Sequence, residues 1–318
     1  MSTKSLFQFA PTFQCLLGCL VATALLVLTF DAAAQVPSAS DNAGLTGTAG
    51  TADFGGKLLL TGGVSQIEGS AGGGLTPWAV IGGYGTGSQV GGNAHATYVH
   101  TQDFAINSYG AEIGIANRVE LSMAHQQLNT RSAGAALGLG AGYRINMDTF
   151  GVKVRVLGDA VLDQDTWVPQ IAVGMQFKRN NNGALVKALG ARSDSGTDFY
   201  VSATKLLLAQ SLLLNGTLRM TKANQFGILG FGGDKSNSYK AAFEASAAYL
   251  LSKSIAVGVE YRMKPNNLGF AREQDAYDAF IAWAPTKYFS LTFAYVDLGD
   301  IATFRRQRGV YGSAQVGF

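Results

Sequence analysis

Cysteine is nearly absent from this sequence. Of its 318 residues only Cys15 and Cys19 are cysteines, and both lie in an N-terminal apolar stretch. A lone positive charge, Lys4, precedes that stretch, and Asp31 and three alanines follow it. This order predicts a cleaved secretory signal peptide over residues 1–34. Its removal leaves a mature chain without thiols, which excludes disulfides, thiolate metal sites and cysteine catalysis.

Charge and long apolar runs are also scarce. Charged residues make up 14% of the chain, against about 25% in typical soluble domains. The net charge of +3 is too small to indicate nucleic acid as a partner. After the signal peptide, no apolar run approaches the roughly 20 residues of a membrane-spanning helix. A chain so poor in charge must hide its apolar side chains in some other way.

Alternation of apolar and polar residues dominates the chain after residue 56. In "SYKAAFEASAAYLL" (238–251) one parity is apolar, with Tyr239 and Tyr249 near its ends, and the other is largely polar or small, with Lys240 and Glu244. A strand presents these two parities on opposite faces. The two tyrosines would lie roughly 25 Å apart along a tilted strand, the height of the lipid-facing band between two aromatic girdles. The pattern favours a transmembrane strand over a strand of a soluble sandwich, which is usually shorter.

The pattern predicts an all-β, antiparallel, up-and-down transmembrane barrel. We predict fourteen strands, at 57–67, 77–86, 94–103, 107–116, 118–127, 149–158, 168–178, 197–208, 211–221, 238–251, 253–264, 276–285, 287–297 and 309–318. The connections alternate between longer and shorter, as extracellular loops and periplasmic turns do. Two connections, 158–167 and 103–107, fit that alternation poorly, so twelve or sixteen strands stay open. Residues 57–318 would form the barrel, and residues 35–56 a flexible leader or a lumenal plug.

Charged side chains fall on the inward parity of the predicted strands. We expect nine of them to line the lumen: Lys153, Arg155, Lys178, Arg219, Lys240, Glu244, Glu260, Arg262 and Asp278. Charges confined to one parity indicate a polar interior. Two interpretations stay open: a water-filled pore with slight anion preference, or interlocking ion pairs that fill a closed barrel.

The last strand, "GVYGSAQVGF" (309–318), ends on an aromatic carboxylate. It places Val310, Val316 and Phe318 on the lipid side. A closing strand that ends in Phe resembles the signal by which the barrel-assembly machinery recognises outer-membrane barrels. The same strand would close the sheet, so that no backbone group is left unpaired in lipid.

Several blocks of the sequence resemble one family of exported proteins. They include "KLLLTGGVSQIEGSAGGGLTPWAVIGGYGT" (57–86), "TLRMTKANQFGILGFGG" (217–233) and "AYVDLGDIA" (294–302). Together they are similar to an uncharacterised Gram-negative family, a domain of unknown function with an outer-membrane location. The resemblance covers nearly all of the mature chain. It implies the location and the barrel, and it implies no catalytic residue.

The motifs that suggest catalysis or cofactors are incomplete. "LGFGGDKS" (229–236) approaches a phosphate-binding loop but misses its first glycine and the residue before its lysine. His95 and His100 are five residues apart, so one strand would point them to opposite sides. Asp159, Asp163 and Asp165 lack the glycine turn and the terminal glutamate of a calcium loop. We therefore expect no cofactor, no metal and no enzyme, although a Ser/His pair of an outer-membrane lipase stays open.

Function is therefore expected to follow from the barrel. The first hypothesis is a porin-like channel or transporter for small solutes in the bacterial outer membrane. The alternative is a closed, non-conducting barrel with a structural, adhesive or assembly role, and an outer-membrane enzyme comes last. The expected partners are outer-membrane lipid, lipopolysaccharide, the assembly machinery and, for a channel, a small solute. The loop "FRRQRG" (304–309) would either contact lipopolysaccharide phosphates or be a solvated basic loop.

Overall fold

The computed structural model describes residues 55–318. The predicted signal peptide (1–34) and residues 35–54 of the predicted leader lie outside the described residues. Within residues 55–318, no helix is long and apolar enough to cross a bilayer.

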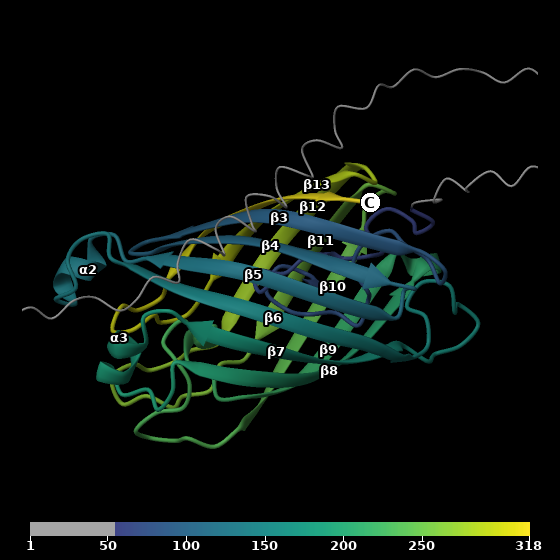
Figure 1. The fold of residues 1–318 in the computed structure, drawn as a ribbon. Helices are drawn as coiled ribbons and strands as arrows, with labels where there is room; N and C mark the ends of the chain where they lie inside the picture. The colour runs from purple at the N-terminus through teal and green to yellow at the C-terminus, as the bar shows by residue number, and fades with distance from the viewer. Residues whose placement is uncertain (1–54) are drawn as a thin grey trace, which may run out of the picture. The chain divides into compact units, whose positions relative to one another are not determined.

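Twelve antiparallel strands form one closed barrel (Figure 1). Each strand pairs with its neighbours along the chain, and β14 closes the ring against β3, with Gly309 opposite Thr101 and Gly317 opposite Asn93. The strands are β3 (Val90–Thr101), β4 (Ala105–Ile115), β5 (Val119–Asn129), β6 (Arg144–Leu157), β7 (Gln170–Asn180), β8 (Ser195–Leu207), β9 (Leu212–Thr221), β10 (Lys240–Leu250), β11 (Ile255–Arg262), β12 (Ala276–Thr286), β13 (Phe289–Asp297) and β14 (Arg308–Gly317). Closure gives the backbone groups of every strand a partner, as a sheet in lipid requires.

The two ends of the barrel differ in their connections. At the end where β14 stops, the strands are joined mostly by short turns, and we call this the turn end. At the opposite, loop end the connections are longer and carry the short helices α2 (Ala133–Ala136) and α3 (Gly183–Ala188). The 3₁₀ turn η2 (Leu208–Gln210) lies in a turn-end connection, and η3 (Gln225–Gly227) lies in a loop-end connection. The connection at 158–169 stays long for the turn end, and that at 102–104 short for the loop end.

Two of the fourteen predicted strands are wrong, and twelve is the number that the structure has. The ranges 57–67 and 77–86 are not in the wall. Their alternation resembles that of a strand, but Leu60, Gly63 and Gly83 have positive φ, which interrupts an extended conformation. Between them they form only a two-residue pairing of β1 (Val64–Ser65) with β2 (Ala71–Gly72). The other twelve predicted ranges each overlap one wall strand.

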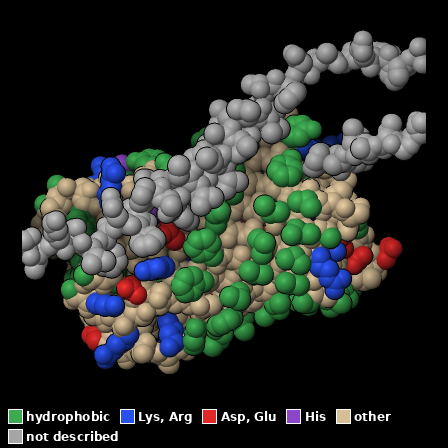
Figure 2. Space-filling model, in the orientation of Figure 1, with side chains coloured by type: hydrophobic (Ala, Val, Ile, Leu, Met, Phe, Trp, Pro, Cys, Tyr) green, Lys and Arg blue, Asp and Glu red, His purple; other side chains and the backbone are tan. Residues whose placement is uncertain are grey.

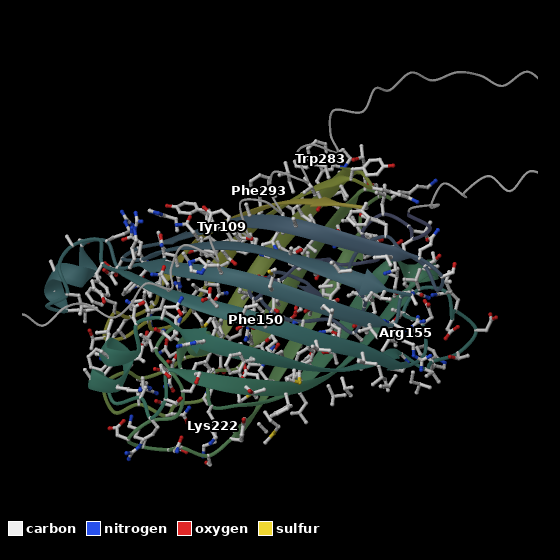
Figure 3. The ribbon with its side chains drawn as sticks, viewed as in Figure 1. Tyr109, Phe150, Arg155, Lys222, Trp283 and Phe293 are labelled. Carbon is white, nitrogen blue, oxygen red and sulfur yellow. The ribbon has the colours of Figure 1, made fainter. Side chains whose placement is uncertain are left out.

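The outward parity of the wall is apolar through the middle of the barrel. Tyr109, Phe150, Trp283 and Phe293 project from it (Figure 3), and each is 45–56% exposed. Figure 2 shows hydrophobic side chains spread over the middle of the wall, with charged side chains towards the two ends. An exposed apolar surface of this extent suits lipid rather than water.

Residues 57–85 fill the inside of the barrel, and we call them the plug. Every residue from 64 to 85 is buried. The plug bonds to wall residues on all sides: Ser65 N donates to Gln315 Oε1, Ala71 N to Glu120 Oε1, Ala79 N to Thr204 Oγ1 and Gly74 N to Glu260 Oε2. These acceptors come from β14, β5, β8 and β11 around the ring. The plug therefore lies in the lumen.

Both ends of the plug lie at the turn end. Lys57 N donates to Tyr84 O at 3.1 Å, so the segment enters and leaves at one place. Tyr84 N in turn donates to the carbonyl of Phe318, the residue after β14. Near the other end of the lumen, the plug side chains Ile67 and Leu75 meet Phe226, Ile228 and Ile301 of the loops around a cavity of about 20 Å³. A space of that volume has room for about one water molecule.

Candidate functional site

The structure places seven of the nine predicted lumen residues inside the barrel. Buried there are Lys153, Lys178, Arg219, Glu244, Glu260, Arg262 and Asp278. Arg155 is half-buried near the turn end, where its Nη1 lies 3.0 Å from Asp159 Oδ2. Lys240 is exposed at the loop-end start of β10. The last two residues therefore belong to the rims of the barrel.

Six charged side chains form a closed ring in the lumen, which we call the charge ring. Its members are Glu68 of the plug and Lys178, Asp198, Arg219, Glu244 and Arg262 of the wall. Going round, Lys178 Nζ lies 2.5 Å from Glu68 Oε1 and 2.7 Å from Asp198 Oδ2. Arg219 lies 3.4 Å from Asp198 and 2.5 Å from Glu244. Arg262 lies 3.4 Å from Glu244 and 2.9 Å from Glu68. Three cations and three carboxylates balance.

Glu68 is the ring member that the plug supplies. Burial alone would raise the pKa of Glu68, but the positive charges of Arg262, Lys178 and Arg219 outweigh it and lower the pKa to about 2. The carboxylate is therefore charged at neutral pH although water does not reach it. Removing it would leave three cations facing two carboxylates, a buried imbalance that costs several kcal/mol unless water or another anion enters.

Contacts other than Glu68 hold both arginines of the ring. Arg219 Nη1 donates to Gln176 Oε1 at 2.7 Å, and its guanidinium lies 5.2 Å from the centre of the Tyr200 ring. The guanidinium of Arg262 lies 4.2 Å from the centre of the Phe226 ring. Such stacking fixes the plane of a guanidinium, which then presents its donors in one direction. The wall part of the ring is thus oriented by the barrel and its loops, and Arg262 Nη1 makes one further hydrogen bond, to the plug carbonyl of Leu75 at 2.8 Å.

The charge ring is the first anchor of the plug, and a second anchor lies where the plug passes β5 and β6. The carboxylate of Glu120 accepts hydrogen bonds from Ala71 N at 3.1 Å, Gly82 N at 2.9 Å and Lys153 Nζ at 2.9 Å. Lys153 Nζ also donates to the carbonyls of Ala71 and Val80. One buried ion pair of the wall therefore provides hydrogen-bond partners for the plug backbone at two places, at Ala71 and at Val80 to Gly82.

A third anchor is Glu260 on β11. It accepts from Gly74 N at 2.6 Å, from Leu75 N at 2.8 Å and from the hydroxyl of Thr76 at 2.5 Å. Its register partner on β12 is Asp278. Nearby, Trp78 Nε1 donates to Ser246 Oγ at 2.9 Å. Plug amides that would otherwise have no hydrogen-bond partner in the lumen are thus paired with side chains of the wall.

Sequence reasoning missed Glu68 and Asp198. Asp198 has the inward parity of β8, as Ser202 does, and this parity marks Asp198 as a lumenal charge. Glu68 follows a range predicted as a strand, and no periodicity marks it as a lumenal charge. The missed pair are two of the three carboxylates in the ring.

The other candidate motifs do not assemble into a site. His95 is buried in the lumen, whereas His125, on the outward parity of β5, lies 2.6 Å from Asp148. Asp159 Oδ1 accepts the backbone amides of Val161 and Leu162, as a turn-capping carboxylate does. Among residues 55–318, no group of three or more His, Cys, Asp or Glu is placed to hold a metal ion.

Comparisons with known proteins give similar solved structures and one family. Among solved structures, the chain is similar to the KdgM porin (10% identity, TM-score 0.46, 71% of this chain and 99% of that chain). It is similar to the NanC porin (13%, 0.46, 71% and 98%) and to the COG4313 outer membrane channel from Pseudomonas putida F1 (11%, 0.42, 74% and 96%). At these identities and scores no function is transferred from them. No curated protein sequence matches the chain. A family model described as "Protein of unknown function (DUF3034)" matches residues 61–315.

Proposed function

The chain belongs to the DUF3034 family, and we propose that it is a porin-like outer-membrane barrel that is closed at rest and passes small solutes when its plug leaves the lumen. The observation that carries the proposal is the plug itself. It fills the lumen, yet it is bound by side chains of the wall rather than by a continuous strand ladder.

The topology supports a plug that can leave. Since Lys57 and Tyr84 are hydrogen-bonded neighbours at the turn end, the whole segment can withdraw through that mouth as a loop. No part of residues 55–318 has to thread through the barrel. The anchors are charged and polar groups, and water can solvate these groups when it replaces the plug.

The location follows from the outer surface. A closed antiparallel barrel with an apolar, aromatic-rich outside is the form in which strands span a membrane, and barrels of this kind belong to the bacterial outer membrane. In that membrane the turn end would face the periplasm and the loop end the exterior. Cleavage of residues 1–34, assembly through Val310, Val316 and Phe318, and contact of the loops with lipopolysaccharide complete the proposal. It contains no catalytic step.

A reversible cross-link tests the proposal. Thr76 Oγ1 of the plug lies 2.6 Å from Ser246 Oγ of the wall, so a T76C/S246C pair can form a disulfide that fixes the plug. Thr97 Oγ1 and Ser313 Oγ, 2.8 Å apart across the seam between β3 and β14, give a matched T97C/S313C control that joins wall to wall. The mature chain has no other cysteine to interfere.

Solute entry into liposomes would be followed in oxidant and in reductant. We expect oxidised T76C/S246C to abolish entry of a small sugar and reduction to restore it, while T97C/S313C conducts like the unmodified chain in both. Equal entry through oxidised and reduced T76C/S246C would mean that the plug is not the gate.

A permanently closed barrel is the second candidate, and the tight filling of the lumen favours it. It predicts no entry in any of these variants, although each is folded. The two candidates are therefore separated by whether the reduced protein conducts at all.

A further inference from the structure

Glu68 occupies a site that the rest of the molecule builds. Its two carboxylate oxygens receive Lys178 Nζ at 2.5 Å and Arg262 Nη2 at 3.0 and 2.9 Å. Arg219 Nη1 lies 3.9 Å away. Three buried cations of the wall thus converge on one carboxylate, and that carboxylate belongs to the plug.

The site persists when its occupant leaves. Lys178, Arg219 and Arg262 are on β7, β9 and β11, so their backbones stay in the wall when the plug withdraws, although Arg262 Nη1 then loses the carbonyl of Leu75 as an acceptor. Gln176 and Tyr200 hold Arg219, and Phe226 stacks on Arg262, independently of Glu68. Asp198 and Glu244 then neutralise only two of the three positive charges. What remains is an oriented cationic pocket of net charge +1 that lacks one carboxylate.

From this geometry, and resting on the proposed function, we propose that Lys178, Arg219 and Arg262 form a binding site for the carboxylate of a small anionic solute, with Glu68 as its internal competitor. Guanidinium groups suit this role because their paired donors match the two oxygens of a carboxylate.

Competition between Glu68 and the solute carboxylate couples solute binding to withdrawal of the plug. A solute carboxylate can bind only to the barrel from which Glu68 has withdrawn, so it shifts the population towards the open state by its binding free energy. A neutral solute of the same size has no such differential affinity and shifts nothing. The solute therefore promotes its own passage.

Trp78 provides a reporter of plug position. It is buried in the lumen, whereas Trp167 and Trp283 are exposed, so W167F/W283F leaves Trp78 as the single tryptophan of the full mature chain. Quenching of its fluorescence by acrylamide measures how much of the plug is displaced, without any need for conductance.

The probe is sodium gluconate, compared with an equal concentration of sodium chloride plus sorbitol. Sorbitol matches gluconate in size and hydroxyl groups but lacks the carboxylate. We expect gluconate to increase Trp78 quenching in a saturable way and sorbitol to leave it unchanged. Equal responses to the two solutions would overturn the carboxylate site.

Substitutions locate the response. R262Q, or K178Q if R262Q does not fold, should lose the gluconate response, whereas R155Q, which removes a cation at the rim, should keep it. E68Q should raise the displaced fraction on the order of a hundredfold without any solute, because it removes one partner from a buried ion network. An E68Q plug as well seated as that of the unmodified chain would contradict the role of Glu68 as the competitor.

The proposed function and this inference can fail separately. If gluconate and sorbitol act alike while T76C/S246C still controls solute entry, the gate stands and the carboxylate site falls. If gluconate displaces Trp78 but the cross-link leaves entry unchanged, the site stands and the gate falls.

Discussion

The inward side of the wall and the plug are both buried but are bonded in opposite ways. Wall strands pair with their neighbours through continuous backbone ladders, for example all along β4 and β5. The plug instead gives its amides to side chains far away in the sequence, from Glu120, 38 residues beyond Gly82, to Gln315, 250 residues beyond Ser65. In lipid a broken ladder has no other partner, whereas in a wet lumen a displaced plug has water. Burial alone therefore does not decide which part of a barrel is permanent.

The largest effect is expected from a substitution at the second anchor, which should displace the plug and leave the wall folded. Lys153→Met leaves the buried carboxylate of Glu120 without its cation, a change that typically costs about 3–5 kcal/mol. We expect the plug to be displaced, with Trp78 accessible to acrylamide, while the barrel keeps the heat-modifiable gel mobility of a folded wall. Lys240→Met, at the exposed rim, is the control and should do neither. Loss of wall and plug together in Lys153→Met would contradict the separation.

A substitution on the lipid-facing side should instead destabilise the wall. Ile281 lies on the outward parity in the middle of β12, and an arginine there costs about 2–4 kcal/mol at the centre of the bilayer. Ile281→Arg should lower the free energy of unfolding by that amount in a denaturant titration in lipid. Leu162→Arg, in the exposed turn at 158–169, is the matched control and should change it by less than about 0.5 kcal/mol. Equal effects of the two substitutions would mean that the middle of the wall does not face lipid.

A smaller effect is expected where plug and wall join. Gly83 has φ of 73°, and a Cβ there would lie 2.4 Å from the backbone of Gly91 and Gly92. Gly83→Ala should therefore destabilise the seated plug by about 1–3 kcal/mol, measured as acrylamide quenching of Trp78. Gly87→Ala, where a Cβ meets no atom within 4 Å, should be neutral. A seated plug in Gly83→Ala would show that this junction adapts.

The smallest effect is a pH dependence confined to the plug. The pKa of Glu68 is about 2 in the seated plug, against an ordinary value of 4.5 that a displaced plug would regain. The seated state gains from this difference above pH 4.5 and loses the gain as the pH falls towards 2. At pH 3.5 the ratio of displaced to seated plug should be about tenfold higher than at pH 7. The charged groups that face Glu68 are Lys178, Asp198, Arg219, Glu244 and Arg262.

The control for this dependence is E68Q, which keeps the other ring members. The difference in Trp78 quenching between the unmodified chain and E68Q isolates the part due to Glu68. If that difference does not change between pH 7 and pH 3.5, the charge of Glu68 does not hold the plug.

The wall could be predicted from the sequence, whereas the plug could not. A wall strand must alternate because its two faces meet lipid and lumen, so the parity of Arg219 or Phe243 can be read from the neighbouring residues. The plug has no such period, since each of its residues meets whichever wall strand is nearest. The range 57–67 alternates by composition and was predicted as a strand, and Glu68 was missed because its partners lie on β7, β9 and β11.

Hydrogen exchange of the folded barrel in lipid, resolved by segment, tests the central claim most directly, since it compares opening of the plug with opening of the wall. The account predicts that the amides of Ala71, Gly74 and Gly82 exchange together and well before the ladder amides of β4 and β5, and that E68Q accelerates the first group only. Exchange of the plug amides only when the wall amides exchange would contradict a plug that leaves an intact barrel.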